Sequence, residues 1–171
     1  MDFLVETPPA FVAPKSKTVV LPMDGGPHTQ EGSYLCHILQ GTKTVEGRRL
    51  RPTLAKLKPG DTLQFGIEPG APPSVTCDIE RTALYPGATY QDAITSMVDE
   101  EGFSNLVPNA ASREEAIEVY KGFLPSTDTQ KSGGEISMIA LHIKNPRVIT
   151  ASVRTPSQTD FSKQAARSSK P

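Results

Sequence analysis

A nine-residue stretch, residues 41–49, concentrates side chains that could bind or transform a ligand. It reads Gly-Thr-Lys-Thr-Val-Glu-Gly-Arg-Arg. Lys43 and Thr44 can donate hydrogen bonds to phosphate or base oxygens, and the two arginines that end the stretch offer forked donors suited to phosphates. Glu46 can pair with Arg48, because alternate side chains of a strand share a face. The stretch therefore predicts a site for an anionic ligand, although the same residues also fit an ordinary basic edge strand with one ion pair.

The elements on either side predict how this stretch is held. Residues 29–39 carry apolar side chains at helical spacing, which predicts an amphipathic helix. Gly41 follows directly, at the position where a helix commonly ends with a glycine in the left-handed conformation. We then expect a strand over residues 43–50, with even-numbered side chains on one face and odd-numbered side chains on the other. Lys43 and Glu46 therefore lie on opposite faces, unless the glycine turn reorients Lys43.

The rest of the chain predicts further strands, two helices and a closing strand. Side chains alternate between apolar and polar over residues 62–67, and residues 136–143 are apolar on both faces, as in a central strand. Ser112 and Glu115 fit a capping box at the start of the last helix. Too few strands alternate with helices for a doubly wound sheet, so we expect an α+β fold, a small mixed β-barrel with flanking α-helices. The expected strands are 17–21, 62–67, 74–82 and 136–143, with an edge strand at 148–153, and the expected helices are 89–98 and 112–123.

Charge is distributed unevenly along a chain whose net charge is only −1. Residues 41–60 carry six basic side chains against one acidic side chain, and residues 99–118 carry six acidic side chains against one basic. Residues 144–171 again hold six basic side chains against one acidic. A chain of this kind can present a positive face to a polyanion without being basic overall, and ordinary solvated charge is the alternative.

Length and composition indicate one domain with tails. The chain has 171 residues, of which 36% are hydrophobic, with 16 prolines and 13 glycines. We expect an extended or disordered arm at 1–17, a domain at 18–153 and a basic disordered tail at 154–171. No stretch reaches the roughly 18 apolar residues that span a bilayer, and the acidic, proline-rich N-terminus fits neither a secretory signal nor a mitochondrial presequence. We therefore expect an intracellular, cytoplasmic protein, with a nuclear location also open.

The cysteines and histidines do not predict a metal site. Cys36 and Cys77 lie among apolar neighbours, and we expect both to be buried, reduced thiols. His28, His37 and His142 stand apart in the sequence, so we expect packing or surface roles for them. We expect no cofactor and no membrane partner.

Residues 41–48 resemble the signature of ASCH domains, which are relatives of the PUA fold. The pattern is G-x-K-T-V-E-G-R after an amphipathic helix, and further segments resemble the family in the same order along the chain. Together they span residues 29–143, about two-thirds of the chain. These segments are the turn into a strand at 57–65, the aromatic stretch at 82–97, the loop at 105–108, the helix at 116–123 and the closing strand at 134–143.

The resemblance implies a PUA-like β-barrel with a cleft beside the signature strand, and RNA or another nucleic acid as the ligand of that cleft. Tyr85, Tyr90 and Phe103 are candidates for stacking on a base, with core packing as the alternative for each. The residues that the resemblance assigns to nucleic-acid binding are Lys43, Thr44, Glu46 and Arg48 in the cleft, Arg49 and Arg51 on its basic rim, and Tyr90 at its mouth.

Binding of RNA without catalysis is the function we expect, by a domain that acts alone or within a ribonucleoprotein. The alternative is a metal-dependent single-strand ribonuclease, in which Glu46 takes the proton of the ribose 2′-hydroxyl and Lys43 stabilises the phosphorane, with Mn²⁺ or Mg²⁺ as cofactor. A shorter branch of the family hydrolyses acetylated cytidine, but it has a threonine where this chain has Glu46, which argues against that activity. A protein-binding adaptor that uses the acidic helix at 114–118 is a third hypothesis.

Overall fold

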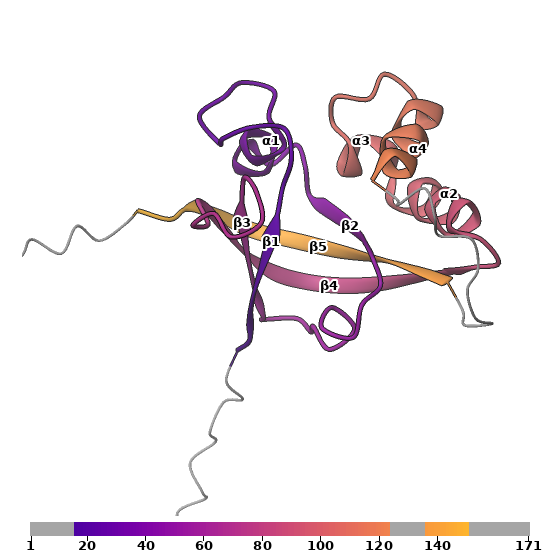
Figure 1. Ribbon diagram of the computed structural model, residues 1–171, viewed down its shortest axis with the longest axis horizontal. Helices are drawn as coiled ribbons and strands as arrows, with labels where there is room; N and C mark the ends of the chain where they lie inside the picture. The colour runs from indigo at the N-terminus through magenta and orange to yellow at the C-terminus, as the bar shows by residue number, and fades with distance from the viewer. Residues whose placement is uncertain (1–15, 124–135, 151–171) are drawn as a thin grey trace, which may run out of the picture.

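The structure is a computed structural model that describes residues 16–123 and 136–150. The five strands in these ranges form one mixed sheet in the order β1-β3-β4-β5-β2, in which only β1 and β3 pair in parallel. The sheet curls into a half-barrel whose edge strands, β1 and β2, come close to each other (Figure 1). The strands are β1 (Thr18–Pro22), β2 (Val45–Arg49), β3 (Thr62–Gly66), β4 (Val75–Gly87) and β5 (Ile136–Val148), and the helices are α1 (Tyr34–Gln40), α2 (Tyr90–Glu101), α3 (Phe103–Leu106) and α4 (Arg113–Gly122).

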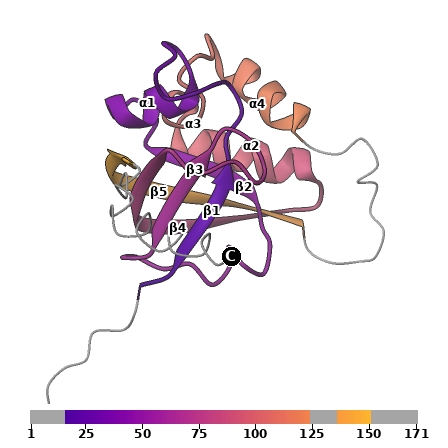
Figure 2. The same ribbon diagram turned by 60° about the vertical axis from the view of Figure 1, so that its left-hand side comes forward.

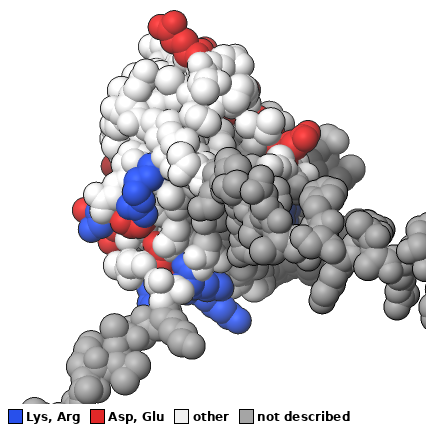
Figure 3. Space-filling model, turned by 90° about the vertical axis from the view of Figure 1, so that its left-hand side faces the viewer, with Lys and Arg blue, Asp and Glu red and all other residues white. Residues whose placement is uncertain are grey.

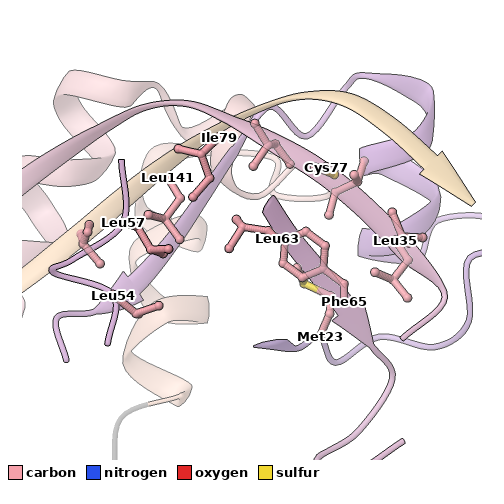
Figure 4. Packing of buried hydrophobic residues seen from close by; sticks show 13 residues of the cluster. Met23, Leu35, Leu54, Leu57, Leu63, Phe65, Cys77, Ile79 and Leu141 are labelled. Carbon is pink, nitrogen blue, oxygen red and sulfur yellow. The ribbon is translucent and has the colours of Figure 1, made fainter. Parts of the chain in front are cut away.

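The curled sheet separates two hydrophobic cores, and this explains why β5 is apolar on both faces. Ile139 and Leu141 point into the inner core, which α1 and the turn at 51–57 close (Figure 4). Met138 and Ala140 point to the outer face, where α2, α3 and α4 pack (Figure 2). The expected α+β fold, a small mixed β-barrel with flanking helices, is confirmed, with the sheet curled into a half-barrel.

Helix α1 begins later than the sequence predicts and ends where it predicts. Gly32 has a φ of 77°, and the Ser33 hydroxyl accepts a hydrogen bond of 3.1 Å from the Cys36 N–H, so Ser33 caps the first turn. Residues 29–32 form turns and a bend instead of the expected first turn of the helix. Gly41 ends the helix with a φ of 74°, as expected. This left-handed residue sets the direction in which the chain enters β2.

Strand β5 continues through Pro146, so the separate edge strand expected at 148–153 is wrong. A β-bulge interrupts the pairing of β5 with β4 at the level of Asn145 and Pro146, and Asn145 has a φ of 51°. The bulge accommodates a proline, which has no N–H to donate to the ladder. Val148 is the last residue of β5, and residues 151–153 lie outside the described ranges.

Two other strand boundaries differ from the expected ones. Strand β3 ends at Gly66, so Ile67 is exposed, although alternation placed it on the same face as the buried Phe65. Strand β4 runs on to Gly87 because it pairs with β5 along its whole length, down to Ile136. The alternation of side chains in the sequence predicts that a strand forms, but its length also depends on how far the neighbouring strand pairs with it.

Helices α2 and α4 begin at side-chain caps. Thr89 and Asp92 form a complete capping box at α2, which the sequence analysis missed. At α4 the Ser112 hydroxyl accepts a hydrogen bond from the Glu115 N–H, as expected, but the Glu115 carboxylate accepts from the Ala111 N–H instead. The two caps fix where the helices begin, and thereby which of their side chains face the sheet.

Most of the expected arm at 1–17 and the whole tail expected at 154–171 lie outside the described residues. Within the described ranges, no helix is both long enough and apolar enough to cross a membrane. Cys36 and Cys77 are free thiols, of which the first is half-buried and the second fully buried. Burial raises the pKa of the Cys77 thiol to about 12, so this thiol stays protonated and unreactive at neutral pH.

Candidate functional site

A cleft of about 540 Å³ lies between the two edge strands of the half-barrel. Residues 19–24 of β1 and the following loop form one wall, and β2 together with Lys43 forms the opposite wall. Leu106 of α3 and Tyr120 of α4 close the space from the helical side. The cleft therefore lies at the seam where the sheet would have to pair with itself to complete a barrel.

Three charged side chains of the signature stretch form one connected group across this seam, the Lys43–Glu46–Arg48 group. Lys43 Nζ lies 3.1 Å from Glu46 Oε2, and Arg48 Nε donates to Glu46 Oε1 at 2.5 Å. The other end of the Arg48 guanidinium donates to the carbonyl of Pro22 in β1. Lys43 and Glu46 are only 3% and 4% exposed, whereas Arg48 is partly exposed. The group thus links both edge strands and places two buried charges in the wall of the cleft.

The position of Lys43 corrects the expectation from simple strand alternation. Its N–H donates to the carbonyl of His37, so Lys43 belongs to the turn that ends α1 and precedes β2. Its ammonium group reaches back into the wall, donates to the carbonyls of Val45 and Leu106, and contacts Glu46. These three acceptors match the three N–H bonds of an ammonium group. Lys43 therefore connects β2 to α3 and holds Glu46, and it has no further proton to offer a ligand.

Burial and the neighbouring charges have opposite effects on Glu46. Burial disfavours its ionised form, but the charges and hydrogen bonds of Lys43 and Arg48 outweigh this effect and hold the pKa of Glu46 below its usual range. For Lys43, burial is the largest effect and lowers its pKa, although Glu46 opposes that shift. Glu46 is therefore an ionised carboxylate at neutral pH, and it can only accept hydrogen bonds.

Two tyrosines complete the cleft, and neither is among the site residues that the sequence predicts. The Tyr120 hydroxyl accepts a hydrogen bond of 3.3 Å from the Gly47 N–H, and burial raises the pKa of Tyr120, so its hydroxyl stays protonated. The Tyr34 ring lies beside the ammonium group of Lys43, which is 5.4 Å from the ring centroid. A Cβ atom at Gly47 would lie 2.6 Å from the Tyr120 hydroxyl oxygen, so a larger residue here would force neighbouring side chains to move.

The remaining candidate residues fall into two groups. Arg49 and Arg51 line the outer part of the cleft, and the Arg49 guanidinium stacks over the Tyr90 ring at 5.0 Å. Tyr90 is thereby next to the rim without lining the cleft itself. Thr44 is half-buried outside the cleft lining, and its carbonyl accepts a hydrogen bond from the Ile143 N–H in β5.

The other two aromatic candidates for base stacking pack in the outer core. Tyr85 is buried and its hydroxyl donates to Glu101, which also contacts His142 Nε2 at 2.8 Å. Phe103 packs against the same core from α3. For Tyr85 and Phe103 the structure therefore supports core packing, which was the alternative to stacking on a base.

The charged segments are partly neutralised by local pairs. Arg113 forms an ion pair with Asp99, and Arg147 forms one with Asp78 at 3.0 Å. On the face drawn in Figure 3, basic and acidic side chains adjoin one another toward the left-hand edge, and most of the remaining surface that is not grey carries neither charge. Among the described residues, no three His, Cys, Asp or Glu side chains are grouped so that they could hold a metal ion.

Comparisons with known proteins support the fold and name no function. No family model matches the chain, and no curated protein matches it significantly. Among solved structures, the crystal structure of hypothetical protein PH0355 is similar, with 24% identity and a TM-score of 0.52 over 77% of this chain and 100% of that chain. The solution NMR structure of protein PF0455 from Pyrococcus furiosus has 25% identity and a TM-score of 0.47 over 74% of this chain and 96% of that chain. The first of these likenesses shows that the fold of this chain occurs in another small protein.

Proposed function

We propose that this chain is an ASCH-type domain of the PUA-like superfamily that binds single-stranded RNA in the cleft between β1 and β2 without cleaving it. The observation that carries the proposal is the Lys43–Glu46–Arg48 group. Lys43, Glu46 and Arg48 of the signature line one wall of the described cleft as a connected set of buried and half-buried charges.

Arg48 is the residue best suited to contact a phosphate. Its Nε–H and one Nη2–H are used by Glu46 and Pro22, which leaves three N–H donors of the guanidinium for a ligand, as far as the described residues go. Arg51 is exposed and lines the outer part of the same cleft. The Lys43–Glu46–Arg48 group has a net charge of +1, so the wall attracts an anion despite its buried carboxylate. These features favour a single strand whose backbone passes over Arg48 and Arg51.

The chemistry of Lys43 and Glu46 favours binding over cleavage. A general base works best when its pKa lies near the working pH, and the pKa of Glu46 is lowered, not raised. The ammonium group of Lys43 already donates to two carbonyls and contacts Glu46, so it is not placed to stabilise a phosphorane. Both residues are therefore suited to holding the shape and charge of the wall.

Fluorescence anisotropy with a labelled single-stranded RNA tests the proposal. We expect Arg48→Ala to weaken binding at least about tenfold, because a hydrogen bond to a charged group contributes roughly 1.5–3 kcal/mol. Arg147→Ala is the matched control, since it removes an exposed arginine that pairs with Asp78 and does not line the cleft. Binding should also weaken as the salt concentration rises, by about 0.7 logarithmic units for each phosphate contact per tenfold change in salt.

The other outcomes separate the alternative functions. Equal binding by the Arg48→Ala and Arg147→Ala proteins would contradict the cleft assignment. Cleavage of the RNA in the presence of Mn²⁺ or Mg²⁺ would favour the ribonuclease alternative over binding without cleavage. No interaction with RNA, together with a protein partner whose capture is lost on charge reversal at 114–118, would favour the adaptor hypothesis.

A further inference from the structure

We propose that Glu46 gives the cleft a preference for guanine, by accepting hydrogen bonds from the two adjacent N–H groups on the Watson–Crick edge of that base. This inference rests on the proposed RNA-binding function and deepens it, because it names the base that the cleft reads. The observations that carry it are the burial of the Glu46 carboxylate in the cleft wall and the way in which its neighbours occupy its oxygens.

The carboxylate of Glu46 keeps one acceptor position on each oxygen. An ionised carboxylate has about four acceptor positions, two on each oxygen. Lys43 contacts Oε2 and Arg48 donates to Oε1, so each oxygen has one partner among the described residues. Because the carboxylate is buried, leaving a remaining position without a donor is costly when a ligand displaces water from the cleft. The wall therefore favours a ligand that offers two neighbouring donors.

Guanine is the RNA base that offers two neighbouring donors on one edge, N1–H and the N2 amino group. Adenine and cytosine each offer one amino group next to an unprotonated ring nitrogen, which a carboxylate repels. Uracil offers one N–H between two carbonyl oxygens, which a carboxylate also repels. A site with unpaired acceptors rejects ligands that lack the matching donors more strongly than an apolar site does.

The neighbours of Glu46 fit the rest of the guanine edge. The O6 carbonyl lies next to N1–H and requires a donor, which Arg48 can supply through its remaining N–H groups or Tyr120 through its protonated hydroxyl. The half-buried Tyr34 ring also lines the cleft and offers a surface on which a base can stack. A volume of about 540 Å³ is in the range of pockets that take one small ligand, so the cleft admits a single splayed base.

The sharpest test changes the RNA and leaves the full-length protein unaltered. Anisotropy is measured with the pentanucleotides UUGUU, UUIUU, UUAUU and UUUUU, where I is inosine, which is guanosine without the N2 amino group. We expect UUGUU to bind at least about fivefold more tightly than each of the other three, since a well-placed bidentate pair discriminates by roughly 5- to 150-fold. A pentanucleotide with 7-deazaguanine is the matched control, and it should bind like UUGUU because the proposed contacts do not use N7.

The Glu46→Gln protein provides an independent test on the protein side. A Gln side chain presents a carbonyl acceptor on one side and an NH2 donor group on the other, so it no longer offers two neighbouring acceptors, and we expect the ratio of UUGUU to UUAUU affinity to fall to about one. A thermal melt of the variant decides whether it is folded at the assay temperature. If it is not folded, the inosine comparison with the unaltered protein still decides the proposal.

Each result has a distinct meaning. Equal binding of UUGUU and UUIUU would overturn the guanine proposal and leave RNA binding in place, provided that Arg48→Ala still weakens it. A stronger preference for UUAUU or UUUUU would overturn it in the same way. Absence of binding to all four pentanucleotides would overturn the RNA-binding proposal and the guanine proposal together.

Discussion

A double-mutant cycle on Lys43 and Glu46 tests the buried ion pair that organises the cleft. The two single variants are Lys43→Met and Glu46→Gln, and the third protein carries both substitutions. Lys43 Nζ and Glu46 Oε2 are 3.1 Å apart. At an effective dielectric constant of about 20, Coulomb attraction at this distance is about 5 kcal/mol, which the cost of removing both charges from water partly offsets.

The expected free energies follow from what each variant leaves behind. Glu46→Gln leaves the fully buried Lys43 ammonium without an opposing charge, so we expect a loss of about 3–5 kcal/mol in the free energy of unfolding. Lys43→Met leaves Glu46 with Arg48 as a partner, so its cost should be about 3 kcal/mol, at the lower end of that range. The double variant should be more stable than the sum of the two effects predicts, by about 2 kcal/mol.

Urea unfolding followed by circular dichroism measures all four proteins. The slope of free energy against urea concentration should be the same for each, which shows that the stability has changed and not the unfolded state. The stability losses of the two single variants could instead sum to within about 0.5 kcal/mol of the loss measured for the double variant. That result would refute the reasoning, because two residues in direct contact cannot act independently.

Three further predictions concern other buried contacts and the protonation of Glu46. Gly47→Ala should lower the free energy of unfolding in urea by about 1–3 kcal/mol, because its Cβ would overlap Tyr120; an unchanged midpoint would contradict the close approach. Tyr85→Phe should cost about 1–3 kcal/mol in the same assay, since Glu101 then loses a buried hydrogen bond; no loss would argue against that contact. Because the pKa of Glu46 is lowered in the folded protein, its carboxylate contributes its full stabilisation above pH 4.5, the usual pKa of the group, and less as the pH falls below that value. The difference in the free energy of unfolding between the unaltered and Glu46→Gln proteins should therefore narrow between pH 7 and pH 3. A difference that stays constant over this range would contradict the lowered pKa.

Local features of the fold could be predicted from the sequence because they depend on neighbours in the chain. Gly41 ends α1 in the left-handed conformation, which a glycine adopts without steric strain because it has no Cβ atom. The apolar residues of β5 fit a strand that is covered on both sides, and the structure places one hydrophobic core on each face. The Glu46–Arg48 pair follows from strand periodicity alone.

The arrangement of the cleft depends on contacts between distant segments and could not be predicted in the same way. Tyr120 meets Gly47 across 73 positions of sequence, and the helical spacing of α4 shows only that Tyr120 faces inward. The contact of Lys43 with Glu46 depends on the turn after α1, which removes Lys43 from the strand alternation. The seam exists because β1 pairs with β3 and leaves its other edge facing β2, and no local pattern determines that choice.

Mapping the bound RNA by NMR tests the central claim most directly. A single-stranded pentanucleotide is titrated into the ¹⁵N-labelled protein, and changes in the amide signals are recorded. Binding in the cleft predicts the largest changes at Val20 and Leu21 on β1 and at Glu46, Gly47 and Arg48 on β2, since these residues line opposite walls of the same space. Changes confined to the outer helices, or no changes at saturating RNA, would contradict it.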